Sequence, residues 1–191
     1  MRQELIDDNV SAGIVEKLKG FDVIADLGCG AGEMLAHLAP FAGRTIGVDS
    51  SPAMLEQAGR TLSCRPDGQT GSVELRLGTL EHLPLADAEA DGALLNMVLH
   101  HLADPPAVLQ EVRRILAPGG KLLVCDLVRH DVEWMREKFG DQWLGFTKQE
   151  LRQFLELANF EVLSIQPFNE KSRPGIILAA AHAPLSKGEN K

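Results

Sequence analysis

Short apolar runs alternate along the chain with longer segments in which apolar residues recur at helical spacing. The runs that predict parallel strands are Phe21–Leu27, Thr45–Asp49, Val73–Leu77, Asp91–Asn96 and Lys121–Leu127. Two further runs, Phe160–Pro167 and Gly175–Ala181, are separated by seven residues, which is too few for a crossover helix. The pattern therefore predicts an α/β fold with a doubly wound, mostly parallel sheet of seven strands that ends in an antiparallel strand pair.

Three of the helical segments carry clear start signals. Pro52 stands at a first-turn position, and Asp104 stands at the N-cap of a second helix. The segment Thr147–Glu150 has the sequence of a capping box for a third helix. We expect the second helix to run through Leu116 and to end at Pro118–Gly120.

Composition places the chain among ordinary globular proteins. It has 191 residues, of which 45% are hydrophobic and 24% charged. This length suits one domain, which we expect over residues 1–185, followed by a flexible polar tail at residues 186–191. The formal net charge of -8 repels phosphate backbones, so we expect no nucleic-acid partner through this domain.

Cysteine spacing and hydropathy both favour a cytoplasmic protein. Cys29, Cys64 and Cys125 have neither the spacing of a disulfide framework nor that of a zinc site, so reduced thiols are expected. No apolar run approaches the ~18 residues needed to span a bilayer, and the first residues lack the apolar stretch of a signal peptide.

The clearest chemical signal is the segment Asp26-Leu27-Gly28-Cys29-Gly30-Ala31-Gly32, directly after the first strand. Glycines there allow a tight turn and let a ligand lie against bare backbone at the carboxyl edge of the sheet. Glu33 follows the third glycine, which departs from the dinucleotide fingerprint. Asp26 places a carboxylate where a ligand ammonium can bind, and a purely structural turn is the alternative interpretation.

Asp49 closes the second strand and is the second candidate ligand-binding acid. An acid at this position can accept hydrogen bonds from both hydroxyls of a ribose that lies across the crevice. It could instead cap the helix that starts at Pro52, but Ser50 and Ser51 can take that role.

Five stretches, in this order and spacing, resemble class I S-adenosylmethionine-dependent methyltransferases. They are Asp26–Gly32, Gly47–Leu55, Gly78–Leu85, Asn96–Leu102 and Leu116–Leu122. The resemblance covers nearly all of the chain and implies a Rossmann-like sheet with S-adenosylmethionine as cofactor. The chain is most similar to the small-molecule branch, such as ubiquinone/menaquinone-biosynthesis methyltransferases. Residues His130–Phe146 resemble the methyltransferase domains fused to ArsR-type regulators.

The resemblance also implies which residues bind the cofactor. These are Asp26, Gly28, Gly30, Gly32, Asp49, Met54, Thr79, Leu80, Glu81, Asn96 and Met97. The glycine loop is expected to lie under the methionine part of the cofactor, with Asp26 nearby. Asp49 is expected to bind the ribose, and Met54 is expected to pack on the adenine. Asn96 and Met97 are expected beside the methyl group that is transferred. Thr79 stands where the family commonly has an Asp that contacts the adenine amine. We therefore expect the adenine edge to contact the Leu80 backbone amide, and Thr79 or Glu81 to take the place of that Asp.

His100 and His101 are the candidate catalytic residues, because they follow the fourth strand where the acceptor is expected to bind. Either can deprotonate or orient an acceptor. Packing at a helix start is the alternative. We expect no metal site here, because adjacent residues rarely share a metal face and no Cys or acid is suitably spaced.

Four of the nine aromatic residues fall between residues 134 and 146: Trp134, Phe139, Trp143 and Phe146. They could form a lid over a flat, apolar acceptor, pack in the core, or make the contact of a homodimer. A thiol-dependent chemistry such as arsenite methylation gains no support, because Cys29 and Cys125 lie far apart in the sequence.

The main hypothesis is therefore a methyltransferase that acts on a small-molecule acceptor. The alternative is an S-adenosylmethionine-binding sensor domain of a transcriptional regulator, without efficient turnover. An NAD-dependent oxidoreductase is disfavoured by Glu33 and by the Pro118–Gly120 turn. Methylation of a nucleic-acid base is disfavoured because Met97 and Val98, rather than Pro-Pro-aromatic, follow Asn96.

Overall fold

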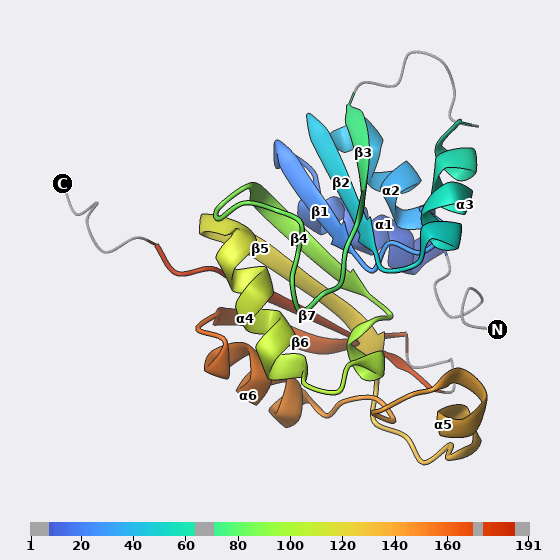
Figure 1. The fold of residues 1–191 in the computed structure, drawn as a ribbon. Coiled ribbons are helices and arrows are strands. Elements are labelled where there is room, and N and C mark those ends of the chain that lie inside the picture. Colours follow the sequence, from blue (N-terminus) through green and yellow to red (C-terminus); the bar gives the residue numbers. More distant parts are fainter. Residues whose placement is uncertain (1–7, 64–70, 170–173, 186–191) are drawn as a thin grey trace.

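A computed structural model describes residues 8–63, 71–169 and 174–185 of the chain. Within these ranges the strands are β1 (Val23–Leu27), β2 (Arg44–Asp49), β3 (Ser72–Leu77), β4 (Ala90–Asn96), β5 (Leu116–Leu127), β6 (Glu161–Asn169) and β7 (Ile176–His182). They form one sheet in the order β3-β2-β1-β4-β5-β7-β6 (Figure 1). β1 to β5 are parallel, whereas β7 runs antiparallel to both β5 and β6. The predicted sheet is confirmed; the expected tail at 186–191 lies outside the described residues.

The helices in the described ranges are α1 (Asp8–Leu18), α2 (Glu33–Leu38), α3 (Pro52–Ser63), α4 (Pro105–Ile115), α5 (Trp134–Phe139) and α6 (Lys148–Leu157), with 3-10 turns η1 (Ala39–Phe41) and η2 (Leu99–His101). Of these, α3, α4 and α6 begin where the sequence signals predict them. The Asp104 carboxylate accepts the Ala107 N–H at the start of α4. The capping box of Thr147 and Glu150 is present at the start of α6. In the part of the chain that the structure describes, none of these helices is long and apolar enough to cross a membrane.

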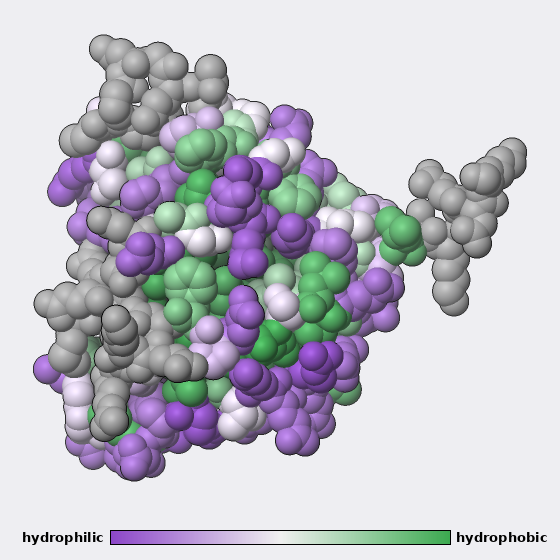
Figure 2. Space-filling view, turned by 180° about the vertical axis from the view of Figure 1, so that it is seen from behind, coloured by the Kyte–Doolittle hydropathy of each residue, from purple (hydrophilic) through white to green (hydrophobic). Residues whose placement is uncertain are grey.

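Alternate residues of the central strands enter two separate hydrophobic clusters, one on each face of the sheet. On β5, Leu122 and Val124 pack with α4 and α6, whereas Leu123 and Cys125 pack with α1 and α2. This is the period of two that a strand imposes on its side chains. Figure 1 shows α4 and α6 together on one face. From behind, apolar side chains gather near the middle of the surface, with polar ones around them (Figure 2).

The end of α4 differs from the sequence prediction. The helix stops at Ile115, and Leu116 already pairs with Ala90 in the sheet. The register between β4 and β5 then shifts, so that Gly92 pairs with Lys121 and residues 117–120 bulge out. Pro118–Gly120 therefore shapes a bulge within β5 and does not end the helix, because strand pairing stops the helix three residues earlier.

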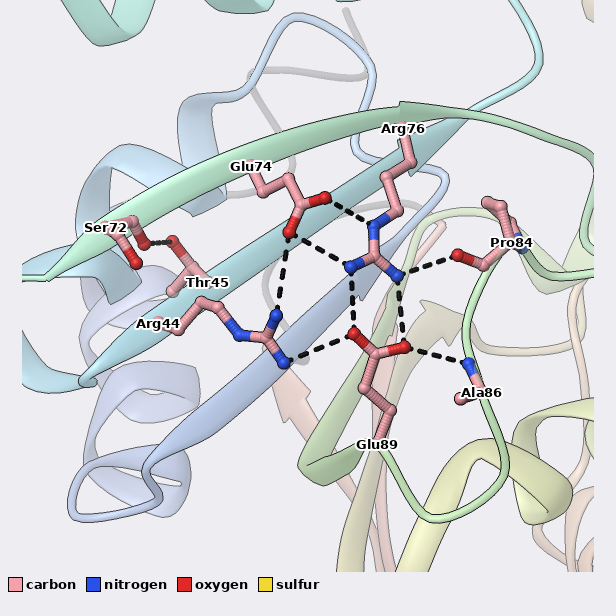
Figure 3. Close-up of polar contacts among 8 residues, drawn as sticks. All are labelled: Arg44, Thr45, Ser72, Glu74, Arg76, Pro84, Ala86 and Glu89. Atoms are coloured by element: carbon pink, nitrogen blue, oxygen red, sulfur yellow. Dashed lines mark hydrogen bonds and ion pairs between the residues drawn. The ribbon is translucent and has the colours of Figure 1, made fainter.

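Residues 78–89 join β3 to β4 without a helix, and two arginines hold this connection. Arg76 on β3 donates to the Pro84 carbonyl at 2.7 Å and to the Glu89 carboxylate at 2.8 Å (Figure 3). The same carboxylate accepts the Ala86 N–H at 2.8 Å. From α4, Arg114 donates to the Leu85 carbonyl at 2.8 Å. These bonds fix a segment that begins with the predicted adenine-contacting residues.

We expect the contribution of Glu89 to stability to disappear in acid. Hydrogen bonds from Arg76, as the main cause, hold the pKa of Glu89 at about 2, below its ordinary 4.5. A lowered carboxyl pKa stabilises the folded state above pH 4.5, and this contribution is lost as the pH falls towards 2. Replacing Glu89 with Gln should therefore reduce the free energy of unfolding by about 3 kcal/mol at pH 7, and by progressively less below pH 4.5, in urea titrations.

Glu56→Gln is the matched control, because Glu56 forms a surface ion pair with Arg60 within α3 and its side chain is 69% exposed. Such pairs contribute at most about 0.5 kcal/mol. Equal losses in the two variants at pH 7 would contradict the role assigned to Glu89.

Candidate active site

A cavity of about 830 Å³ opens at the carboxyl ends of β1, β2, β3 and β4. Its lining residues are Gly28, Gly30, Ala31, Asp49, Ser50, Met54, Gln57, Gly78, Thr79, Leu80, Glu81, Met97, Val98, His101 and Leu102. The sheet order reverses direction between β1 and β4, and ligands of doubly wound sheets bind at such a switch point. The cavity therefore lies where the fold places a ligand.

The cavity brings together eight of the eleven predicted cofactor-binding residues. They are Gly28, Gly30, Asp49, Met54, Thr79, Leu80, Glu81 and Met97. Asp26, Gly32 and Asn96 are not among its lining residues. Sequence reasoning missed Ser50 and Gln57, although the position of Gln57 one turn after Met54 on a helix beside the glycine loop was a usable signal.

The three glycines after β1 have different tasks. Gly30 has φ +52°, and a Cβ added there would meet nothing within 4 Å, so its bare backbone faces open space. Gly28 has φ +78°, and its Cβ would come within 2.6 Å of the Val98 side chain. Gly32 has φ +80°, and its Cβ would lie 2.9 Å from the Cβ of Ala58 on α3. Gly30 thus leaves room for a ligand, whereas Gly28 and Gly32 allow neighbouring segments to approach.

The Asp49 carboxylate links the glycine loop to the start of α3. Its Oδ2 accepts the Gly30 N–H and its Oδ1 accepts the Ser51 N–H, each at 2.9 Å. The Ser51 hydroxyl accepts the Met54 N–H at 3.3 Å, so Ser51 is the residue that caps the helix. Asp49 is therefore held in one orientation at the cavity wall, with lone pairs left for ligand hydroxyls.

Asp26 lies behind the cavity wall rather than on its surface. It is 1% exposed, and its Oδ2 has no hydrogen-bond partner among the described residues. Burial, and secondarily the Asp49 carboxylate, raise the pKa of Asp26 to about 7. Asp26 can therefore change charge near neutral pH.

The end of β4 is strained where it meets the cavity. Met97 adopts φ +57°, which is costly for a residue with a side chain, and its N–H donates to the Cys125 carbonyl at 2.7 Å. The strained residue is thus one of those that line the cavity. The side chain of Asn96, one residue earlier, is partly buried, and its Oδ1 has no hydrogen-bond partner among the described residues.

The structure separates the two candidate catalytic histidines. His101 lines the cavity, and its side chain is 33% exposed. His100 is fully buried, and its Nδ1 lies 2.7 Å from Asp126 Oδ1. Direct contact with an acceptor through the cavity is therefore open to His101 alone of this pair, whereas His100 lies behind it.

An aspartate from a distant segment reaches both histidines. Oδ1 of Asp141 lies 3.6 Å from His101 Nδ1 and 3.9 Å from His100 Nε2. The N–H groups of Gln142 and Trp143 both donate to the His100 carbonyl at 3.0 Å, which fixes this segment against η2. The expectation that no acid is suitably placed is wrong, because it considered spacing along the sequence and not in space.

The aromatic segment packs mainly within the protein. Phe146 is fully buried, and the Trp143 indole N–H donates to the Leu102 carbonyl at 2.9 Å. Trp143, Phe146 and Phe154 contact one another. Trp134 is 46% exposed and contacts Phe139 instead. None of the four predicted lid residues is among those that line the cavity, so core packing is the correct interpretation for Trp143 and Phe146.

Comparison with known sequences identifies relatives of the chain. The profile of the family described as "Methyltransferase domain" matches residues 25–124. An arsenite methyltransferase of Halobacterium salinarum is 30% identical over 160 residues, covering 79% of this chain and 40% of that protein. A demethylmenaquinone methyltransferase of Symbiobacterium thermophilum is 32% identical over 129 residues, covering 65% of this chain and 50% of that protein. The chain thus spans half or less of these relatives.

Solved structures show the same fold. A S-adenosylmethionine-dependent methyltransferase of Aquifex aeolicus superimposes with a TM-score of 0.76 at 19% identity, covering 95% of this chain and 96% of that one. The chain belongs to the methyltransferase domain family and has the fold of a class I S-adenosylmethionine-dependent methyltransferase.

Proposed function

We propose that this chain transfers the methyl group of S-adenosylmethionine to a small-molecule acceptor. The observation that carries the proposal is that one cavity contains both the glycine loop with Asp49 and, after β4, the histidine His101. The first group suits a nucleoside cofactor, and the second can contact the molecule that receives the methyl group. Donor and acceptor would therefore meet in a single cavity.

The cavity residues fit S-adenosylmethionine. Gly30 presents backbone without a side chain, and Asp49 offers an oriented carboxylate to a ribose. Met54, 42% exposed, offers an apolar surface to an adenine ring. A volume of about 830 Å³ lies within the range of small-molecule sites and has room for a cofactor and an acceptor. When bound, the cofactor supplies a methyl group already activated by a sulfonium.

The main role of the protein in the reaction would then be to align the acceptor with the methyl group. Holding the acceptor atom in line with the methyl group replaces a bimolecular encounter and lowers the barrier. His101 would orient the acceptor or take its proton, whereas His100, held by Asp126, would keep η2 in position. An acceptor with a weakly acidic hydroxyl group gains most from such a base.

The lining favours an apolar acceptor over arsenite. His101 shares the cavity lining with three apolar residues that lie close to it in the sequence: Met97, Val98 and Leu102. Burial raises the pKa of the Cys29 and Cys125 thiols, and neither of these residues lines the cavity. Cys64 lies outside the described residues. A flat, apolar molecule that carries a nucleophilic oxygen or nitrogen is therefore the acceptor class we propose.

The test is formation of S-adenosylhomocysteine. The protein with S-adenosylmethionine and a panel of hydroxylated aromatic and quinol compounds should release it with at least one acceptor, as measured by mass spectrometry. Tight binding of S-adenosylmethionine without product from any acceptor would favour the sensor alternative. Binding of NAD in its place would contradict the cofactor assignment.

Loss of the His101 imidazole should slow methyl transfer and leave cofactor binding intact. We expect His101→Ala to lower kcat about 100-fold with an acceptor found in that panel, because a positioned base contributes that much or more. The dissociation constant of S-adenosylhomocysteine, measured by calorimetry, should stay within twofold. Unchanged kcat would remove His101 from the mechanism.

Replacing Asp49 with Ala should weaken S-adenosylhomocysteine binding at least tenfold. The variant loses the ribose acceptor and also the two N–H contacts that hold the loop. Asp104→Ala is the matched control, because it also loses a backbone N–H contact but lies at the N-cap of α4. Calorimetry should find wild-type affinity in the control; equal loss in both variants would contradict the placement of the cofactor.

Binding should depend on pH through Asp26. Its pKa of about 7 means that the carboxyl group holds a proton below neutrality, and a ligand ammonium is stabilised only by the charged form. We expect the affinity for S-adenosylhomocysteine to rise about tenfold from pH 6 to pH 8 and to lose this slope in Asp26→Asn. A pH-independent affinity in the wild type would show that Asp26 does not interact with the ligand.

A further inference from the structure

A buried cluster of His100, His101, Asp126 and Asp141 lies at the acceptor end of the cavity. Three of these residues are fully or almost fully buried, and His101 connects the cluster to the cavity. One ligand atom from each of His100, His101 and Asp141 lies within 4.8 Å of the other two. The combination of two imidazoles and one carboxylate is the donor set of several catalytic zinc sites.

The environment of His100 determines which of its nitrogens can bind a ligand. The carboxylate of Asp126 only accepts hydrogen bonds, so Nδ1, 2.7 Å from Oδ1, carries the hydrogen in the neutral ring. The lone pair is then on Nε2. This atom is buried and has no hydrogen-bond partner among the described residues. A histidine whose other nitrogen donates to a carboxylate is the usual arrangement around protein-bound metals.

The charges of the cluster also favour a cation. Asp126 is fully buried and Asp141 is 3% exposed, and both carboxylates pair with histidine rings. Buried carboxylates are stabilised by nearby positive charge. A dication coordinated by Asp141 and the two rings would supply such a charge.

A third histidine, His130, lies near the cluster but is not suited as a ligand. Its Nδ1 accepts the Val132 N–H at 3.2 Å, so its Nε2 carries the hydrogen. The donor set therefore remains His100 Nε2, His101 Nδ1 and the Asp141 carboxylate.

We propose that these three groups bind a divalent transition-metal ion of the Zn²⁺ type. Ligand atoms at zinc distances lie about 3.4 Å apart. The two separations from Asp141 Oδ1, 3.6 and 3.9 Å, are close to this value, and all three ligand atoms lie within 4.8 Å of one another, so the rings need to move together to close around an ion. Because His101 lines the cavity, an ion held by this residue would be reachable from the cavity. An acceptor hydroxyl or phenol would be the fourth ligand, and its pKa would fall on coordination. With an ion bound, His101 would thus act on the acceptor as a metal ligand and not as a base.

This inference rests on the proposed function only for the identity of that fourth ligand. Metal binding itself can be measured without turnover. If the wild-type protein binds Zn²⁺ but transfers no methyl group to any acceptor, only the proposed function is contradicted. If it transfers a methyl group but binds no Zn²⁺, only this inference is contradicted.

The experiment is calorimetric titration of the chelator-treated chain, residues 1–191, with Zn²⁺, followed by titration with Co²⁺ and measurement of its visible absorption. We expect one ion per chain, absorption bands of a tetrahedral site, and a loss of affinity of at least tenfold in His101→Ala. His37→Ala is the matched control, since His37 is an exposed histidine on α2, and it should bind as the wild type does.

A second variant tests whether weaker Zn²⁺ binding comes from the loss of a ligand and not from a folding defect. Asp141→Asn keeps the size of the side chain and should also weaken Zn²⁺ binding at least tenfold while retaining affinity for S-adenosylhomocysteine. No stoichiometric binding by the wild type, or equal affinity in wild type, His101→Ala and Asp141→Asn, would overturn the proposal.

Discussion

The cavity depends on one carboxylate that joins two loops. Asp49 accepts N–H groups from Gly30 and Ser51, which follow different strands of the sheet. The first contact fixes the backbone against which a ligand would lie, and the second fixes the start of α3, which carries Met54 and Gln57. Because the strands are rigidly paired, holding these two loops together gives the cavity its shape before any ligand binds.

The carboxyl edge of the sheet places three aspartates in three different environments. Asp26 is desolvated, and its pKa rises to about 7. Asp49 is held by backbone N–H groups, whereas Asp126 accepts from the backbone N–H and the imidazole of His100. One residue type at one edge thus has three local roles: a buried group whose pKa lies near neutrality, an acceptor of backbone N–H groups from two loops, and a support for a histidine. Neighbouring groups, and not the residue type, determine which task each performs.

Sequence reasoning found the parts of the protein that local patterns determine. The strands alternate their side chains, Asp104 and Thr147 cap their helices, and the glycine loop identifies the ligand edge. It could not find the end of α4, because pairing of Leu116 with Ala90 decides that boundary. It also could not find Asp141, which reaches the histidines from a segment about 40 residues further along the chain. Asp126 was within reach, since it stands near the end of a strand as Asp26 and Asp49 do.

All residues that line the cavity fall within the part of the chain that matches the family profile, whereas part of the structure behind them does not. The glycine loop, Asp49 and His101 lie within residues 25–124, which match the family profile. Asp126, Asp141 and Trp143 lie beyond that match, and they hold His100, His101 and Leu102 from behind. A fold that keeps its donor site can change its acceptor by varying the segment that supports the other end. Residues 126–146 are therefore the segment through which the support of the two histidines could change while the glycine loop and Asp49 stay the same.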